Sequence, residues 1–433
     1  MDFQSIIARR RDGEKHSQEE LIFLATGAAD GSVPDYQLTA WLMAAFLNPL
    51  DAEETAWLTL AMADSGDRID LSGIPKPWVD KHSTGGVGDK TSMVLLPLLA
   101  ACGLTVVKMS GRGLGITGGT VDKLGAIPGF RLDLSPSEMK AQAAKIGLAL
   151  TGQTPDLAPA DKTLYALRDA TTTVGSVPLI VSSILSKKLA GGAETVVLDV
   201  KCGKGGFMPT VDAATSLADS LAKTGKLCGL NIRIAITDMD QPLGSAVGNA
   251  VEVREALRVL KGEQSRFSHL CVELAALTLE ASGLQPDRES GRKAAFEALT
   301  SGAAASKAQA WFFAQGATVD VLEQPEAMPI APVRVEVKHE GQPAWIAGLD
   351  AKEVGLAVVA LGGGRQKKDS VIDLAVGVEL HGEIGDKLET GQTMFVVHAS
   401  TEEKARVAIA QIESAYLLSD TAVPHLDPIL RIL

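Results

Sequence analysis

Two glycine-rich segments lie close together in the chain, and both combine glycines with hydroxyl and cationic side chains. Residues 80–89 read DKHSTGGVGD, and residues 109–124 read MSGRGLGITGGTVDKL. Each segment follows a short apolar run and precedes a sequence that suits a helix. Glycines in such a turn leave backbone N–H groups free, and these groups bind anions at the start of a helix. The two segments together therefore predict a phosphate site.

Specific side chains in these segments suit a bound phosphate. A P-loop would need glycine, lysine and threonine in succession, but Asp89 separates Gly88 from Lys90, so this motif is excluded. A single loop of this kind can also be a tight turn in which glycines only relieve steric clashes. Two hydroxyl-rich loops on adjacent strands favour the anion site, for which the candidate ligands are Lys81, Ser83, Ser92, Ser110 and Thr120.

His82 stands between Lys81 and Ser83 at the end of the first predicted strand. A lone histidine is more often structural than catalytic. Beside an anion site, however, an imidazole can donate a proton or a hydrogen bond to a leaving group near neutral pH.

A second binding surface is predicted on a helix over residues 177–190. Ile180, Ser183, Ile184 and Lys187 recur at helical spacing and share one face. An apolar stripe with a hydroxyl and a cation suits a flat heteroaromatic ring with polar edges. The alternative is a half-buried amphipathic helix with Lys187 reaching solvent. Arg168 is a candidate for the same cleft, although an isolated arginine is usually part of a surface ion pair.

The elements that position these residues follow a strand, loop and helix pattern. The pattern begins at Trp78 and returns near residues 104, 195 and 232, which predicts an α/β fold with a parallel sheet and ligands at its carboxyl edge. Helical patterns over residues 1–65 and 160–190 predict a small all-helical domain in two sequence pieces. Residues 78–155 and 195–330 then form a large α/β phosphate-binding domain, and residues 331–433 an α+β C-terminal domain.

The composition excludes several classes of protein. The formal net charge is −12 and the sequence pI is about 5.2, so a broad basic surface for nucleic acid or anionic membrane is not expected. No apolar stretch reaches the roughly 18 residues of a membrane span. The four cysteines form neither a CxxC pair nor a metal-binding pattern with histidine. These features predict a reduced, cytoplasmic protein without a resident metal.

The motifs resemble those of the pyrimidine-nucleoside phosphorylases, which include thymidine phosphorylase. The resemblance covers most of the chain, and the second glycine-rich segment is its most specific part. It implies a helical domain and an α/β domain that close over a cleft, in a homodimer. It also implies reversible phosphorolysis of pyrimidine (deoxy)nucleosides such as thymidine, with inorganic phosphate as co-substrate and no organic cofactor. The matching stretches are residues 34–37, 79–89, 110–114, 157–162, 187–189, 206–209 and 248–255.

The resemblance also implies a role for individual residues. Lys81, Ser83, Ser92, Ser110 and Thr120 would hold phosphate, and Arg168, Ser183 and Lys187 would hold the pyrimidine. His82 would contact the base and assist its departure, with Arg168 and Lys187 stabilising the charge that develops there. Leu114, Ile180, Ile184 and Phe207 would form the apolar surround of the base.

Three positions depart from the family pattern. Relatives usually carry a histidine where Ile116 stands, and the motif normally ends in a glutamate where this chain has Gly125. Some bacterial relatives bind potassium near the positions of Gly88, Leu243, Ala246 and Glu255. Here Lys90 stands among these residues, and we expect its ammonium group to replace the ion and pair with Glu255.

Two other functions remain open from the sequence. The first is a phosphoribosyltransferase of the anthranilate type, which would bind pyrophosphate through magnesium, with Asp199 and Asp122 as the plausible acidic ligands. The second is a non-catalytic nucleoside-binding relative, altered around Ile116 and Gly125. The sequence does not distinguish thymidine from uridine as the preferred substrate.

Overall fold

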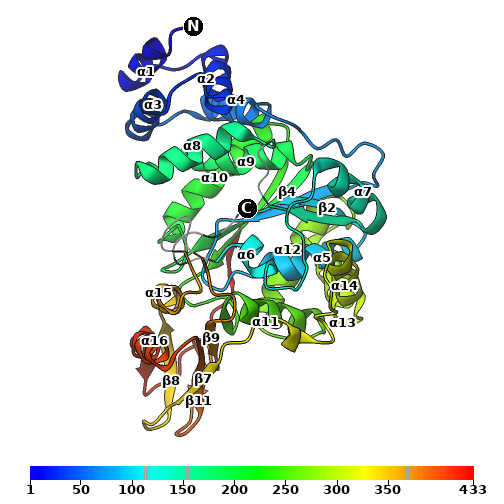
Figure 1. Cartoon of the computed structure of the whole chain (residues 1–433), viewed down its shortest axis with the longest axis vertical. Helices are drawn as coiled ribbons and strands as arrows, with labels where there is room; N and C mark the ends of the chain where they lie inside the picture. Colours follow the sequence, from blue (N-terminus) through cyan, green and yellow to red (C-terminus); the bar gives the residue numbers. More distant parts are fainter. Residues whose placement is uncertain (112, 114–115, 117, 153–155, 366–370) are drawn as a thin grey trace.

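The computed structural model describes residues 1–111, 113, 116, 118–152, 156–365 and 371–433. Leu114, expected beside the base, lies outside the described residues. Along the long axis of the molecule, a group of helices, a central sheet with its covering helices, and a region of smaller sheets follow one another (Figure 1). This architecture confirms the predicted combination of helical, α/β and C-terminal α+β parts.

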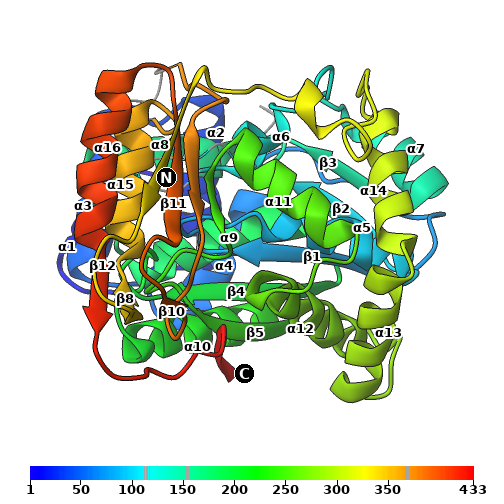
Figure 2. The ribbon, with the colours of Figure 1, turned by 90° about the horizontal axis from the view of Figure 1, so that it is seen from below.

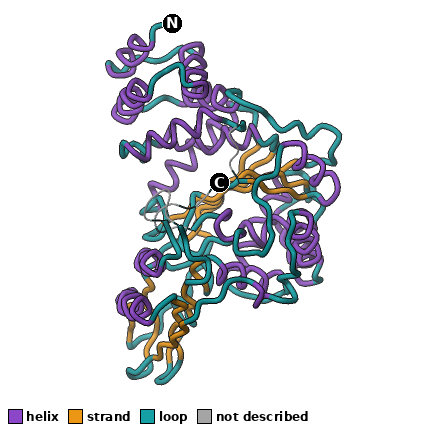
Figure 3. Tube along the Cα trace, in the orientation of Figure 1, coloured by secondary structure: helices purple, strands orange, loops and turns teal. Residues whose placement is uncertain are grey.

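The helical part, the group of purple helices at the top of Figure 3, is built from two separate pieces of the chain. Leu164 of the second piece and Leu179 share one apolar core with Trp41 and Leu42 of the first. Ser17 forms a capping box at the start of α2, with the Glu20 N–H bonded to the Ser17 hydroxyl. The helices are α1 (Phe3–Arg11), α2 (Gln18–Asp30), α3 (Asp35–Leu47), α4 (Ala52–Ala63), α8 (Pro159–Ala170) and α9 (Val177–Ala190).

The central sheet has six strands in the order β13-β5-β4-β1-β2-β3, all parallel except β13. Its strands are β1 (Trp78–Ser83), β2 (Thr105–Met109), β3 (Leu148–Thr151), β4 (Thr195–Cys202), β5 (Asn231–Asp238) and β13 (Ile429–Ile432). β4 is buried along its whole length, as expected for a parallel strand covered on both faces. Val197 faces one core, whereas Val196 and Leu198 face another.

Helices cover both faces of this sheet. The core that contains Val197 lies against α5 (Thr91–Ala101), α11 (Ala250–Leu260), α12 (Arg266–Ala281), α13 (Arg288–Thr300) and α14 (Ala303–Ala314). The opposite face is covered by α9, α10 (Val211–Leu227) and α7 (Pro136–Ile146). The short helix α6 (Thr120–Leu124) follows the second glycine-rich segment.

Two smaller antiparallel sheets form most of the C-terminal region. One contains β6 (Ala246–Gly248), β9 (Gly377–Leu380), β11 (Thr393–Ala399) and β7 (Val333–Lys338); the other contains β10 (Lys387–Leu388), β8 (Ala344–Leu349) and β12 (Tyr416–Ser419). Helices α15 (Ala351–Leu361) and α16 (Glu402–Ala415) lie side by side against them (Figure 2). A short 3-10 helix spans Pro325–Ala327.

The central and C-terminal sheets exchange strands. β6 comes from the part of the chain that otherwise forms the α/β region, yet it pairs with β9. β13, at the end of the chain, returns to pair with β5 of the central sheet. The two regions are therefore joined by hydrogen-bonded backbone and not only by linkers.

Candidate active site

The carboxyl ends of β1 and β2 bring three of the predicted phosphate ligands, Lys81, Ser83 and Ser110, to one edge of the central sheet. β1 lies between β2 and β4, and Ser83 pairs in register with Asp199. Val79 pairs with Val106, so Ser110 follows β2 at about the level of Ser83. The sequence prediction that consecutive strand ends lie side by side is confirmed.

The first loop is held in shape by its own side chains. The Ser83 hydroxyl donates to the Asp89 carboxylate and accepts a hydrogen bond of 3.1 Å from the Gly85 N–H. Gly88 has a φ of +75°, and a Cβ there would lie 2.8 Å from the Leu243 carbonyl oxygen. This position therefore requires glycine for both backbone conformation and space.

The charged side chains around this loop are buried, and each lies near side chains of the opposite charge. Burial alone would raise the pKa of Asp89, but Lys81, Lys201 and Lys123 outweigh it and hold that pKa well below its usual range. Burial works against the charge on Lys81, yet Asp89 and Asp199 raise its pKa. Lys81 is thus a cation with no exposed surface at the strand end.

The second loop is tied to the C-terminal region. Asp122 of α6 accepts hydrogen bonds of 2.7 Å from the Gly113 N–H and of 2.7 Å from Arg365. Ile116 packs against Gly355 of α15, where an added Cβ would lie 3.1 Å from the Ile116 carbonyl oxygen. The isoleucine that departs from the family pattern thus makes an apolar contact with this helix.

The same helix α6 also supports the first loop. The Lys123 ammonium group donates to the Asp89 carbonyl at 2.8 Å and pairs with Glu252 of α11. Gly119 is the N-cap residue of α6, and Thr120 is its first helical residue. Gly125 takes the C-cap position in ordinary right-handed geometry, so the helix ends there without a side-chain cap. Ser92 lies in the first turn of α5 and is buried.

His82 is surrounded by lysines. Burial is the largest cause that lowers its pKa well below the usual range, followed by the charges of Lys188, Lys108, Lys187 and Lys81. The imidazole is therefore neutral at physiological pH. A neutral imidazole offers one N–H donor and one acceptor to a ligand.

Asp80, two residues before His82 on β1, forms ion pairs with two of these lysines. Lys188 pairs with its carboxylate at 2.6 Å, and Lys108 lies 3.4 Å from its other oxygen. Lys108 also donates to the carbonyl of Lys81. Burial lowers the pKa of Lys108 to about 7, although Asp80 opposes this shift.

The predicted base-binding residues come together on α8 and α9. The Lys187 ammonium group donates to the Ser183 hydroxyl at 3.0 Å and pairs with Asp161. Arg168 donates to the carbonyls of Leu179 at 3.0 Å and Val174 at 2.7 Å, which joins the two helices. Burial lowers the pKa values of Lys187 and Arg168, and Asp161 opposes both shifts.

The predicted apolar surround is only partly assembled. Ile184 is buried in the core between α9 and α10, and Ile180 packs against the same core, so both contribute to folding. Phe207, on the loop after β4, is 51% exposed. Its aromatic ring is one of the larger apolar groups that this edge of the sheet presents to solvent.

Several polar residues of the site were not among the predicted ligands. Asp161, Asp80, Lys108 and Lys201 are buried, and each pairs with a charged group of the site. Asp161 lies within a stretch quoted for the family resemblance. Lys108 and Lys201 are lysines within apolar strands that are buried along their whole length, and a lysine in such a run is the sequence signal that would have identified them.

Lys90 occupies the position at which potassium was considered. Its ammonium group lies 2.5 Å from the Leu243 carbonyl, 2.9 Å from the Ala246 carbonyl and 2.7 Å from the Glu255 carboxylate. The expected ion pair with Glu255 is therefore present. Lys90 is 1% exposed, so its charge is fully enclosed.

The two carboxylates proposed as magnesium ligands are already engaged by protein cations. Asp199 accepts a hydrogen bond of 2.6 Å from Thr237 and lies within ion-pair distance of Lys81 and Lys201. Asp122 is bound by Arg365 and the Gly113 N–H. Neither carboxylate is oriented as an open metal ligand.

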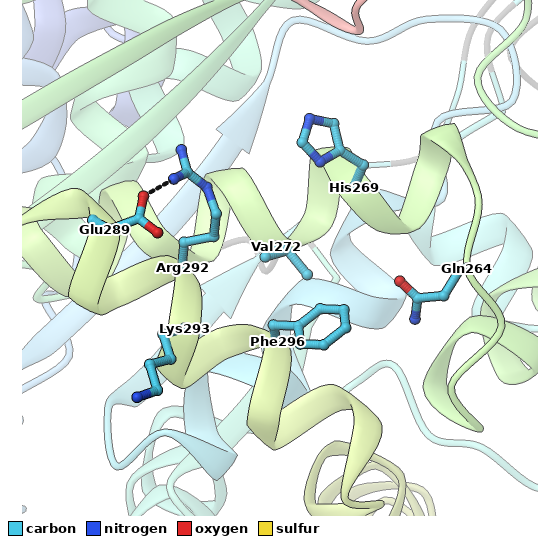
Figure 4. A pocket seen from close by; sticks show the side chains of 7 residues that line it. All are labelled: Gln264, His269, Val272, Glu289, Arg292, Lys293 and Phe296. Atoms are coloured by element: carbon cyan, nitrogen blue, oxygen red, sulfur yellow. Dashed lines mark hydrogen bonds and ion pairs between the residues drawn. The ribbon is translucent and has the colours of Figure 1, made fainter.

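A separate surface groove lies between α12 and α13 (Figure 4). Its volume of about 280 Å³ is small for a ligand site, which usually exceeds roughly 300 Å³. Arg292, its most prominent cation, is already paired with Glu289 and Glu273. The groove shares no residue with the strand ends described above and is lined by Gln264, His269, Val272, Glu289, Arg292, Lys293 and Phe296.

Comparison with known proteins identifies the family. Residues 4–66 match the helical bundle domain of a glycosyl transferase family, residues 75–305 its a/b domain, and residues 345–419 the pyrimidine nucleoside phosphorylase C-terminal domain. The chain belongs to the pyrimidine-nucleoside phosphorylase family. The pyrimidine-nucleoside phosphorylase of Staphylococcus epidermidis is 43% identical over 92% of both chains. That of Staphylococcus haemolyticus is 42% identical over 98% of both chains.

A solved structure shares the fold at lower sequence similarity. Anthranilate phosphoribosyltransferase from Thermus thermophilus superposes with a TM-score of 0.61 at 20% identity, covering 73% of this chain and 99% of its own. At this identity the likeness concerns the fold alone. Within the described residues, no helix has the length and apolar character needed to cross a membrane.

Proposed function

We propose that the protein catalyses the reversible phosphorolysis of pyrimidine (deoxy)nucleosides, thymidine among them, to the free base and a pentose 1-phosphate. The observation that carries this proposal is the position of His82. His82 directly follows Lys81 on β1, and Lys188, the neighbour of Lys187 on α9, pairs with Asp80 of the same strand at 2.6 Å. The strand that carries His82 therefore connects the predicted phosphate loop with the helix that carries the predicted base-binding residues.

On the phosphate side, Lys81 supplies a buried positive charge, and Ser83, Ser92, Ser110 and Thr120 supply hydroxyl groups. The N-terminus of α5 and the loop N–H groups add fixed dipoles that favour an anion. Phosphate held here is the nucleophile. Its oxygen forms the new bond to C1′ of the pentose as the bond from C1′ to the base nitrogen breaks.

On the base side, the bonding electrons of the broken bond pass to the pyrimidine. Lys187 and Arg168 stabilise the negative charge that develops on the ring, and this stabilisation is strong because Arg168 is buried and the Lys187 side chain is only 17% exposed. Neutral His82 donates a hydrogen bond to the departing base. The proton lost by hydrogen phosphate ends on the base, so charge and atoms balance.

The geometry favours this reaction over the phosphoribosyltransferase alternative. A magnesium-dependent phosphoribosyltransferase needs free carboxylates near the loops, and both Asp199 and Asp122 are bound by cations. A non-catalytic nucleoside-binding protein would retain Lys187 and His82 but would not convert the nucleoside to products. Only the turnover assay below separates that case from the phosphorylase.

The assembly we propose is a homodimer through the helical part. Helix α3 exposes Tyr36 and Leu47, which are 74% and 70% exposed, with Met43 and Phe46 on the same helix. Tyr165 of the neighbouring α8 is 39% exposed. Such clustered apolar side chains usually mark a protein interface. We place the protein in the cytoplasm, in line with its four free thiols.

We further propose that the activity needs no potassium ion. The Lys90 ammonium group already contacts two carbonyl oxygens and one carboxylate, which are the ligand types that a monovalent cation prefers. A cation beside it would meet like-charge repulsion. The enclosed lysine instead links the first loop to the 243–246 segment and to α11.

The test is a substrate panel. Purified protein is incubated with thymidine, deoxyuridine or uridine, with and without inorganic phosphate, and the free base is quantified by chromatography. We expect base release that depends on phosphate, with the relative rates setting the preference. Release from none of the three nucleosides by folded protein would refute the proposal.

A further inference from the structure

Lys201 and Lys81 share one carboxylate between neighbouring strands. The Lys201 ammonium nitrogen lies 2.8 Å from Oδ2 of Asp199, and that of Lys81 lies 3.5 Å from the same oxygen. All three side chains are 0% exposed. Neither ammonium group has a well-directed hydrogen-bond partner among the residues that the structure describes.

The sheet register produces this arrangement. Lys81 pairs with Val197, two residues before Asp199 on β4, so Lys81, Asp199 and Lys201 lie on one face of adjacent strands. The Thr237 hydroxyl donates to Oδ1 of Asp199 at 2.6 Å and fixes the carboxylate plane. Oδ2 is thereby directed to the two lysines.

The two lysines lie at unequal distances from Oδ2 of Asp199, and this difference matters because the buried carboxylate needs a compensating positive charge. A buried carboxylate without a compensating cation is strongly unfavourable, because no water can reach it. If Lys201 were absent, Lys81 would be the only cation within ion-pair distance of Oδ2 of Asp199 among the residues that the structure describes. Lys81 would then be drawn toward Asp199 and away from the glycine-rich loop.

We propose that Lys201 is a positioning residue of the anion site: it neutralises Asp199 and so leaves the ammonium group of Lys81 available to the phosphate dianion. This inference rests on the proposed function. It assigns to the end of β4 a part in phosphate binding that acts through Lys81. What the structure gives is the contact of Lys201 with Asp199.

The test separates the phosphate KM from the nucleoside KM in four proteins: wild type, K201M, D199N and D199N/K201M. Methionine keeps most of the length of the side chain and removes the charge. We expect K201M to raise the phosphate KM by about tenfold or more and to change the nucleoside KM by less than about twofold. The D199N/K201M variant should recover most of the loss, because the carboxylate that captures Lys81 is gone.

Two controls keep the result decisive. K204M removes a lysine that is 63% exposed, three residues along the chain, and should behave as wild type. K201R retains the charge and should keep the phosphate KM close to the wild-type value. If K201M does not fold, D199N and D199N/K201M are compared with each other, and the proposal requires equal phosphate KM values.

Three outcomes would overturn the inference. A K201M variant with the wild-type phosphate KM would remove any role for Lys201 in this site. A D199N/K201M variant as impaired as K201M would mean that Lys201 does not act through Asp199. Equal increases in both KM values would indicate a general structural defect. Failure of the proposed function is distinct from all three, because the wild-type protein would then show no phosphorolysis.

Discussion

Lys187 connects two helices of the fold and also carries the positive charge of the predicted base site. Its ammonium group is held by Asp161 and Ser183 on two helices, so its position is set before a substrate enters. A preorganised cation in a site that excludes water stabilises developing negative charge more strongly than a solvated one. The helical spacing predicted Lys187 and Ser183, but not Asp161, because the partner lies on another helix.

Replacing Lys187 should therefore affect the base more than the phosphate. We predict that Lys187→Met lowers kcat/KM for the nucleoside by roughly 10²- to 10³-fold and leaves the phosphate KM nearly unchanged. Steady-state kinetics with each substrate varied in turn measures both effects. Lys223→Met, an exposed lysine on α10, is the matched control. A variant with wild-type kcat/KM would exclude Lys187 from the base site.

His82 should also influence stability through its protonation. Burial and the surrounding lysines lower its pKa in the folded state, while the unfolded chain binds a proton near pH 6.5. Below that pH the unfolded state binds more protons, so His82 makes stability fall as pH falls.

We predict that His82→Asn reduces the drop in Tm between pH 7 and pH 5.5. Thermal unfolding followed by circular dichroism at the two pH values measures this difference. The exposed His269, replaced by Asn, should leave the pH dependence unchanged. An identical drop in wild type and His82→Asn would show that His82 is not held neutral in the folded protein.

At the scale of elements, the two phosphate loops depend on supports far away in the chain. Arg365, which follows α15, donates to the Asp122 carboxylate of α6 and to the Gly113 carbonyl of the second loop. Lys123 of α6 reaches the backbone of the first loop at Asp89. The C-terminal region therefore contributes to the geometry of the loops although it supplies none of the predicted ligands.

Removing Arg365 tests this support. Arg365→Met leaves the buried Asp122 carboxylate without its cation, which should lower the free energy of unfolding by about 3 kcal/mol. We also expect a higher phosphate KM, because the Gly113 loop loses its anchor. Chemical denaturation and phosphate kinetics provide the two readouts. Arg406→Met, which removes an exposed ion pair on α16, should change neither. An Arg365→Met variant indistinguishable from wild type would contradict this account.

Lys90 gives a prediction that involves a metal ion. Activity of the wild-type protein should be equal in potassium and tetramethylammonium buffers, because the lysine occupies the cation position. In Lys90→Ser, the carbonyls of Leu243 and Ala246 face Glu255 without a cation, so stability should become dependent on potassium. Thermal unfolding of Lys90→Ser in the two buffers measures how much its stability depends on potassium. Strong activation of the wild-type enzyme by potassium would refute the proposal that the Lys90 ammonium group takes the place of the ion.

The sequence predicted the parallel sheet and its functional edge because glycine-rich turns and the repeated strand, loop and helix pattern are local signals. The paired charges around Asp199, Asp80 and Asp122 were not predicted, because each pairs with residues distant in the chain. The pairing of β6 with the C-terminal sheet and of β13 with the central sheet could not be predicted from local sequence patterns either. Both strands are short, with three and four residues.

At the scale of the whole molecule, exposed apolar side chains on α3 support a dimer. We predict that Tyr36→Glu combined with Leu47→Glu converts the protein to a monomer in sedimentation velocity experiments. Leu227→Glu, at a 53% exposed position on α10, is the control and should leave the dimer intact. A wild-type protein that sediments as a monomer would exclude this interface.

The central claim is that phosphate, held at the sheet edge, is the nucleophile that releases the base. The measurement that tests it most directly is the stoichiometry of products from thymidine, deoxyuridine or uridine, with phosphorus NMR for the sugar ester and chromatography for the base. The account predicts one pentose 1-phosphate for each free base and no base without phosphate. Base released without a phosphate ester, or no base from any of the three nucleosides, would contradict it.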